Sequence, residues 1–288
     1  MSTTAVPEPR HALAAGPQAN LNPVYLTLTL AKLTAKRILS RKLFWIMLIL
    51  GLGPTTIAGF WVVVNFSPDI GVHTRPYGMF RDILGQYFQG FFLPVLALAM
   101  GLGVISEEIE SRNITFTLVR PIHRIGIAAG RVLGHMLVGW LILITAITGS
   151  YLANIMFQID ELFATLPHLL NIMFVLCFGF AGYLCTIAMF GTFWKKPAVF
   201  ISIVFLLIDW FFANLPNKTL LFVSIRYRMM NSYWEPLPRF TPSLQDITTG
   251  VASLNALIVL ALFVAVPLGI MAFRLSQFEI VLSGGTQE

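Results

Sequence analysis

The stretch ISEEIESRNITFTLVRPIHR, residues 105–124, separates two long apolar runs, residues 86–105 and 125–157. It carries three glutamates and three arginines in a chain in which only 11% of residues are charged. Each flanking run reaches the roughly 20 residues that an α-helix needs to cross a bilayer. A charged segment between two such runs predicts two membrane-spanning helices that are joined in water. We call residues 105–124 the elbow.

The composition extends this reading to the whole chain. Of its 288 residues 57% are hydrophobic, and the mean hydropathy is +0.78, which is too apolar for a soluble domain. The apolar runs are continuous rather than alternating, so they predict α-helices and not the strands of a membrane barrel. The sequence therefore predicts an all-α, polytopic membrane protein with six transmembrane helices, at residues 43–64, 86–105, 125–157, 166–190, 197–215 and 251–273.

The ends of the chain differ from this transmembrane domain, residues 43–273. Residues 1–21 have no apolar core of the signal-peptide kind and predict a disordered cytosolic tail, and residues 274–288 predict a second cytosolic tail. Residues 22–42, NPVYLTLTLAKLTAKRILSRK, mix apolar residues with five cationic ones. They predict an amphipathic helix that lies in the membrane interface with its basic side chains reaching the head groups. A basic tail held only by charge is the alternative.

The distribution of basic residues predicts the orientation. If both termini are cytosolic, 13 of the 19 Lys and Arg residues fall on the inner side, as expected for a multi-pass protein of the inner (plasma) membrane. The net charge of +6 then reflects topology and contact with anionic lipid, and no nucleic acid is expected. The inner set is Arg10, Lys32, Lys36, Arg37, Arg41, Lys42, Arg112, Arg120, Arg124, Arg131, Lys195, Lys196 and Arg274.

Two features inside the spans are candidates for function. Gly126, Gly130 and Gly134 form a stripe at four-residue spacing that lets another helix approach closely. The stripe predicts a helix-packing face, and a subunit interface, a translocation path and a contact within one bundle all remain open. Asp209 is the sole carboxylate predicted inside a span. It is a candidate for proton coupling or a polar lining. The sequence favours a position near the interface, where Asp209 reaches water or a hydroxyl group.

The last outer loop, residues 216–250, is rich in aromatic residues and proline. This mixture is neither a spanning pattern nor a disordered linker. It predicts short structured helices at the outer interface. Such helices fit a cap over an exit path and an aromatic anchor equally well.

The elbow has the features of a stiff connection. Glu108 precedes Arg112 by four residues, the favourable order for an ion pair on an exposed helix. Pro121 bars Arg120 from helical geometry and suits the first turn of the next helix, so it predicts a joint between two rigid pieces. A handle for another protein and a solvated loop are equally compatible with this pattern.

The order of these motifs resembles the signature of the permease subunits of type-2 ATP-binding-cassette (ABC) exporters. An acidic helix, a Thr-Leu pair, a Pro-x-x-Arg motif and a Gly-Arg pair follow one another at residues 107–110, 117–118, 121–124 and 130–131. The resemblance implies that the elbow is a coupling helix that docks on a cytosolic ATPase. The implied ATPase-coupling residues are Glu107, Glu108, Glu110, Arg112, Phe116, Pro121 and Arg124.

The same resemblance implies the partners. Two ABC ATPase subunits and a second permease, identical or homologous, would form a dimer-based assembly in the lipid bilayer. This chain lacks the phosphate-binding pattern G-x-x-x-x-G-K-[ST], since GTFWKK at residues 191–196 has neither the second glycine nor the hydroxyl. It is therefore expected not to be an enzyme and to bind no cofactor itself, with ATP and Mg held by the ATPase.

Other classes of membrane protein remain as alternatives. A secondary transporter normally shows internal repeats, and none is convincing here. A membrane-embedded enzyme needs clustered ionisable groups within its spans, where Asp209 stands alone. Cys177 and Cys185 share one predicted helix, eight residues apart, so they cannot bridge each other, and no Cys/His spacing typical of a metal site occurs. A structural membrane anchor is a further alternative.

Overall fold

The computed structural model describes residues 23–67, 71–72, 76–104, 124–155, 159–194, 197–215, 223–232 and 253–277. Apart from one small hairpin, all elements in these ranges are helices, which confirms the predicted all-α class. The hairpin pairs β1 (Phe66–Ser67) with β2 (Gly71–Val72) in antiparallel register. The helices are α1 (Pro23–Leu39), α2 (Lys42–Asn65), α3 (Pro76–Ile83), η1 (Leu84–Phe92), α4 (Leu93–Gly101), α7 (Arg124–Ile155), α8 (Ile159–Phe193), α9 (Ala198–Ala213), α11 (Ile225–Ser232) and α12 (Ser253–Ser276).

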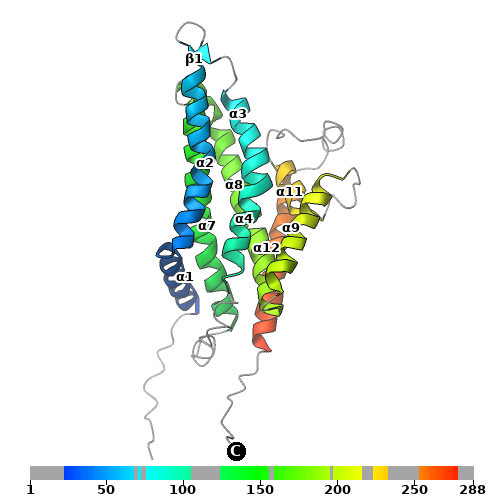
Figure 1. Ribbon diagram of the computed structural model, residues 1–288. Coiled ribbons are helices and arrows are strands. Elements are labelled where there is room, and N and C mark those ends of the chain that lie inside the picture. Colours follow the sequence, from blue (N-terminus) through cyan, green and yellow to red (C-terminus); the bar gives the residue numbers. More distant parts are fainter. Residues whose placement is uncertain are drawn as a thin grey trace, which may run out of the picture.

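The long helices run side by side as one bundle (Figure 1). In this bundle α7 packs against α1, α2 and α8, and α12 packs against α8 and α11. The hairpin lies at one end of the bundle and α1 at the other. Large side chains from different helices fill the centre, for example Phe80 and Tyr151, whose rings meet edge to face at 5.3 Å and are almost fully buried.

Five helical segments are long and apolar enough to cross a membrane: Lys42–Val64, Met79–Gly101, Gly126–Ile155, Leu162–Phe193 and Asn255–Arg274. They coincide with five of the six predicted spans. The remaining predicted span, residues 197–215, is occupied by α9, which has 16 residues. At 1.5 Å per residue α9 rises about 24 Å, less than the roughly 30 Å of a bilayer's hydrocarbon core. The bundle thus has five full spans and one short apolar helix among the described residues.

The second span begins earlier than the sequence predicts. Its apolar segment starts at Met79 rather than at residue 86, because α3 runs without a break into η1 and buries Phe80 and Leu84 completely. The adjacent charges of Arg81 and Asp82 hide this start from a reading of hydropathy. The fourth span also starts early, at Leu162 rather than residue 166, and includes Pro167 within α8.

The middle of the second span is a π-helix, η1. Just after it the backbone N–H of Leu93 donates to the carbonyl oxygen of Phe88, five residues earlier instead of four. The next residue, Pro94, explains the widening. Proline has no N–H, and its ring would crowd the carbonyl of Gly90, four residues earlier, in an ordinary α-helix. Such wide turns are rare and are frequent at functional sites.

The glycine stripe of α7 faces α1. A Cβ atom added to Gly130 would lie 2.8 Å from the carbonyl oxygen of Thr27, and one added to Gly134 would lie 2.8 Å from that of Ala31. The stripe therefore lets two backbones of the same chain touch. Gly126 lies one turn earlier on α7.

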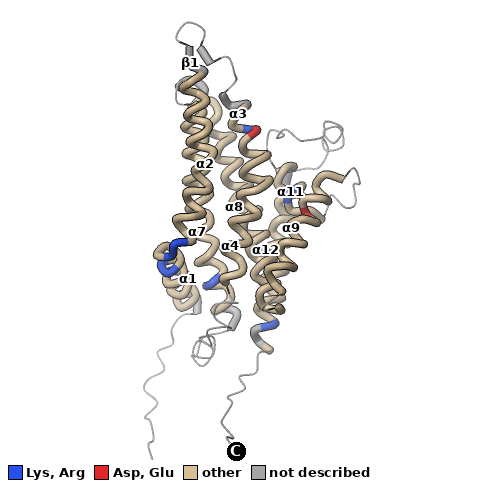
Figure 2. The backbone as a smooth tube through the Cα atoms, viewed as in Figure 1, with Lys and Arg blue, Asp and Glu red and all other residues tan. Residues whose placement is uncertain are grey.

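Within the predicted segment 22–42, Pro23–Leu39 form a helix, α1, while its position at a membrane surface stays a prediction. Tyr25, Leu28 and Leu33 on α1 are each more than half exposed. Figure 2 shows Lys and Arg gathered on α1, and further ones toward the ends of α7 and α12 that lie at the same end of the bundle, opposite β1. Exposed apolar side chains beside a cluster of cations are typical of a helix in the interface.

Candidate functional site

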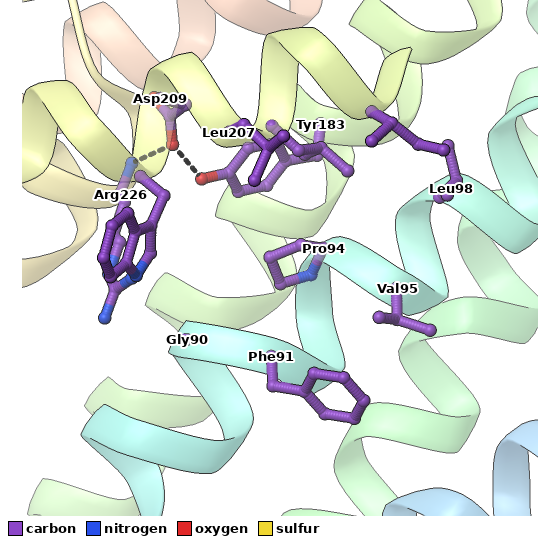
Figure 3. A pocket seen from close by; sticks show the side chains of 12 residues that line it. Gly90, Phe91, Pro94, Val95, Leu98, Tyr183, Leu207, Asp209 and Arg226 are labelled. Atoms are coloured by element: carbon purple, nitrogen blue, oxygen red, sulfur yellow. Dashed lines mark hydrogen bonds between the residues drawn. The ribbon is translucent and has the colours of Figure 1, made fainter. Parts of the chain in front are cut away.

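A cleft of about 440 Å³ lies where the π-helix meets the short apolar helix α9 (Figure 3). One wall consists of Phe91, Val95 and Leu98 from η1 and α4, and the other of Ile203, Leu206 and Leu207 from α9. Pro94, whose ring accounts for the wide turn, also lines the cleft. The cleft is thus a largely apolar site, built on the most irregular backbone of the second span.

The polar groups of the cleft are Tyr183 on α8, Asp209 on α9 and Arg226 on α11. The Asp209 side chain is only 5% exposed and accepts three hydrogen bonds. The Tyr183 hydroxyl donates to Oδ2, the backbone N–H of Ile225 donates to Oδ1 at 2.8 Å, and the backbone N–H of Arg226 donates to Oδ2 at 3.3 Å. The carboxylate therefore joins three helices at one point.

These bonds cap the start of α11. The first N–H groups of a helix have no partner within the helix, and they need one when the helix end is buried. Asp209 serves the N–H groups of Ile225 and Arg226, and the hydroxyl of Ser224 accepts from the N–H of Tyr227 at 3.2 Å. Ser224 also donates to the carbonyl oxygen of Asp209 at 3.2 Å. The first turn of α11 is accordingly satisfied by α9 and by its own cap.

Two further contacts hold α11 in the bundle. The Nε2 of Gln89, a fully buried side chain of η1, donates to the carbonyl oxygen of Arg226 at 3.0 Å. The Met229 side chain fills the space above Gly179 on α8, and any Cβ at that glycine would overlap its sulfur. The short helix of the last loop is therefore part of the packed bundle and not a separate surface element.

Arg226 brings a positive charge to this apolar region. Its side chain is 3% exposed, and its Nη2 lies 3.3 Å from the place where a Cβ of Gly90 would stand. In Figure 3 the side chain extends from Asp209 toward η1, where Gly90 lies. Glycine at this position leaves room for the guanidinium beside the cleft.

Sequence reasoning found one member of this cluster and missed the others. Asp209 was singled out as an intramembrane carboxylate near a hydroxyl, and that hydroxyl belongs to Tyr183. Arg226 falls within the predicted outer loop, residues 216–250, and Gln89 and Tyr183 give no signal within their apolar runs. The available signal was the pair of arginines in a loop full of aromatic residues, IRYR at residues 225–228.

The predicted coupling residues lie elsewhere. Glu107, Glu108, Glu110, Arg112, Phe116 and Pro121 fall outside the described residues, and Arg124 is the first residue of α7. Their docking role therefore stays a prediction. The helices on either side of the elbow are described: α4 ends at Gly101 and α7 begins at Arg124.

The chain matches a known protein family. The sequence profile of the ABC-2 family transporter proteins matches residues 31–278. This range begins within α1 and ends just after α12, so it includes the π-helix, the cleft and α11. No curated protein matches the chain by sequence.

Proposed function

Because the chain belongs to the ABC-2 transporter family, we propose that it is the permease subunit of an ABC exporter, driven by a separate ATPase subunit. The family match over most of the chain carries this proposal. The five apolar segments of spanning length make it a multi-pass membrane protein. The experiments below test the coupling to the ATPase and the residues that are proposed to perform it.

The shape of α7 supports a mechanical role for the elbow. This helix has 32 residues, so it extends about 48 Å from the end of the elbow across the bundle. A displacement of its first turn would be carried along a continuous helix. The early turns of α7 also hold α1 through Gly130 and Gly134. An ATPase that grips the elbow would consequently move α1 and α7 together.

The cleft is our candidate for part of the translocation path. It lies between the second span and α9, next to the irregular backbone of η1. Broken or widened helices in membranes are tolerated where they are buried in protein or line a cavity. The buried cluster around Asp209 then forms one end of this path, in agreement with the predicted polar lining.

The arrangement of charges supports cytosolic termini. The cations of α1, Lys32, Lys36 and Arg37, lie at the end of the bundle where α12 ends (Figure 2). An excess of Lys and Arg marks the cytosolic side. We therefore place the elbow on this side, where an ATPase can reach it.

The docking proposal is tested by reversing charge in the elbow. Glu107→Lys with Glu108→Lys should abolish capture of the ATPase in a pull-down. The new lysines would face, and be repelled by, the basic surface of the ATPase that the glutamates are proposed to match. Insertion and thermal stability of the isolated permease should change little, since exposed charges contribute under about 1 kcal/mol. Full ATPase capture by this variant would refute docking at the elbow.

A second variant separates docking from force transmission. Pro121→Ala removes the predicted joint and lets one helix continue through it. Capture of the ATPase and ATP hydrolysis should persist, while transport falls. Equal transport by this variant and the original chain would show that the joint has no mechanical role.

The assembly is proposed to hold two permeases and two ATPases. Co-expression with the ATPase, followed by purification in mild detergent, should give a particle with two copies of each class. Recovery of a lone permease monomer under these conditions would contradict it. Repeating the purification with two differently tagged copies of this chain shows whether the second permease is identical.

A further inference from the structure

We propose that the cleft binds an amphipathic anion, with its apolar body between α4 and α9 and its anionic group against Arg226. As the cargo of an exporter this ligand rests on the proposed function. Its binding to the chain is a separate property that can be measured without an ATPase.

The walls of the cleft select an apolar body. Val95 and Leu98 on α4 face Leu206 and Leu207 on α9 across a space of about 440 Å³. Leu207 is 61% exposed, so this wall continues outward to the surface of the bundle. The volume lies within the roughly 300–1,000 Å³ of small-molecule sites. A helix of a partner protein is about 10 Å across, and two turns of it would already occupy more than the volume of the cleft. An alkyl or acyl chain fits the cleft better than a protein segment does.

The polar end selects the sign of the charge. The carboxylate of Asp209 is directed to Tyr183 and to the two N–H groups of α11, so its acceptor oxygens are engaged within the protein. The guanidinium of Arg226 lies beside Gly90, at the lining of the cleft, and brings a positive charge there. A guanidinium presents N–H donors in a planar fork that matches a carboxylate or phosphate group. The cleft therefore favours an anion over a cation.

Trp210 offers a reporter at the site, because it lines the cleft and is half exposed. The probes are phosphatidylglycerol and phosphatidylcholine with brominated acyl chains, added to the purified chain in mild detergent. Bromine near the indole quenches its fluorescence, and the same titration of Trp210→Phe isolates the Trp210 signal. The anionic lipid should quench Trp210 at about a tenfold lower concentration than the zwitterionic one.

Two buried arginines on one helix provide a matched pair. Arg226→Gln should remove the preference for the anionic lipid, while Arg228→Gln should keep it, because Arg228 is buried on α11 but does not line the cleft. Arg226→Lys should retain most of it. A preference that survives Arg226→Gln, or that Arg228→Gln removes equally, would overturn the proposal.

The proposal stays testable if Arg226→Gln does not fold. Equal quenching of Trp210 by the two lipids in the original chain would refute it without any Arg226 variant. Val95→Trp should fill the cleft and weaken quenching by both lipids, and unchanged quenching would place the ligand elsewhere. A brominated long-chain carboxylate tests whether a free amphiphile binds as a bilayer lipid does. ATPase capture should be normal in Arg226→Gln, so a failure here is distinct from a failure of elbow docking.

Discussion

Two helices outside the five long spans, α1 and α11, are attached to the bundle in opposite ways. The first touches α7 through backbone contacts at two glycines, Gly130 and Gly134. The second is held by the buried carboxylate of Asp209, which serves the first N–H groups of α11. The contact between the backbones of α1 and α7 depends on the small size of the glycines. The contact between α9 and α11 depends on hydrogen bonds that the Asp209 carboxylate accepts. The first attachment should consequently tolerate polar change and fail on added volume, and the second should do the reverse.

Removing the carboxylate is the strongest test of this contrast. Asp209→Ala leaves two N–H groups of α11 and the Tyr183 hydroxyl without their acceptor inside the bundle. At about 1–3 kcal/mol for each orphaned group, the loss of stability should be about 4 kcal/mol. Thermal melting in mild detergent measures it. Asp82→Ala, at an exposed aspartate on α3, is the control for charge and should melt like the original chain.

Adding one methyl group to the glycine stripe should have the next largest effect. In Gly134→Ala the new Cβ meets the carbonyl oxygen of Ala31 at 2.8 Å, which forces α1 away from α7. Overpacking of this kind costs about 1–3 kcal/mol. Faster protease cleavage within α1 should report the separation.

The control for that change is Gly269→Ala on α12, where a Cβ meets nothing within 4 Å. It should be neutral or raise stability slightly, since alanine favours a helix over glycine. Equal protease sensitivity in the two variants would show that the stripe does not hold α1.

The cap of α11 gives a smaller and more specific effect. Ser224→Ala removes the acceptor for the N–H of Tyr227 and should lower stability by about 1 kcal/mol. Because the side chains of Ser224 and Asp209 both cap the first turn of α11, their losses should not add in the double variant. Simple additivity in thermal melting would mean that the two groups act independently.

The smallest effect on stability is expected at the charges of α1. Lys32→Gln with Lys36→Gln should change thermal stability in a neutral detergent by under about 1 kcal/mol. In anionic bilayers each lysine near the surface contributes about 1 kcal/mol of attraction. The variant should therefore lose the extra stability that the original chain gains in anionic nanodiscs. A variant that keeps this gain would place α1 away from the lipid surface.

Sequence periodicity and hydropathy predict the features that depend on neighbouring residues in the chain. The five long spans are visible as apolar runs, and α1 as a basic segment before them, because each depends on neighbouring residues. The stripe at Gly126, Gly130 and Gly134 was visible as a packing face, but its partner was not. A small residue shows that something comes close without showing what.

The site depends on contacts that no local pattern encodes. Asp209 meets Ile225 across 16 residues and Tyr183 across 26, and Gln89 meets Arg226 across 137. The π-helix had a partial signal, since Pro94 within an apolar run predicts a disturbed turn. Whether that turn kinks or widens is decided by packing. The burial of Arg226 has no local signal either, because it comes from packing against other helices.

The separation between Asp209 and α11 also matters while the protein is being made. Asp209 leaves the ribosome 16 residues before Ile225, about one to three seconds at ordinary rates of synthesis. During that interval the Asp209 carboxylate of α9 lacks the two backbone donors that α11 provides. Tyr183 has already been synthesised and is the first donor that Asp209 meets. The hydrogen bonds of Asp209 are therefore complete only when α11 has been synthesised, so chains truncated before α11 should hold α9 less firmly against α8 than the full chain does.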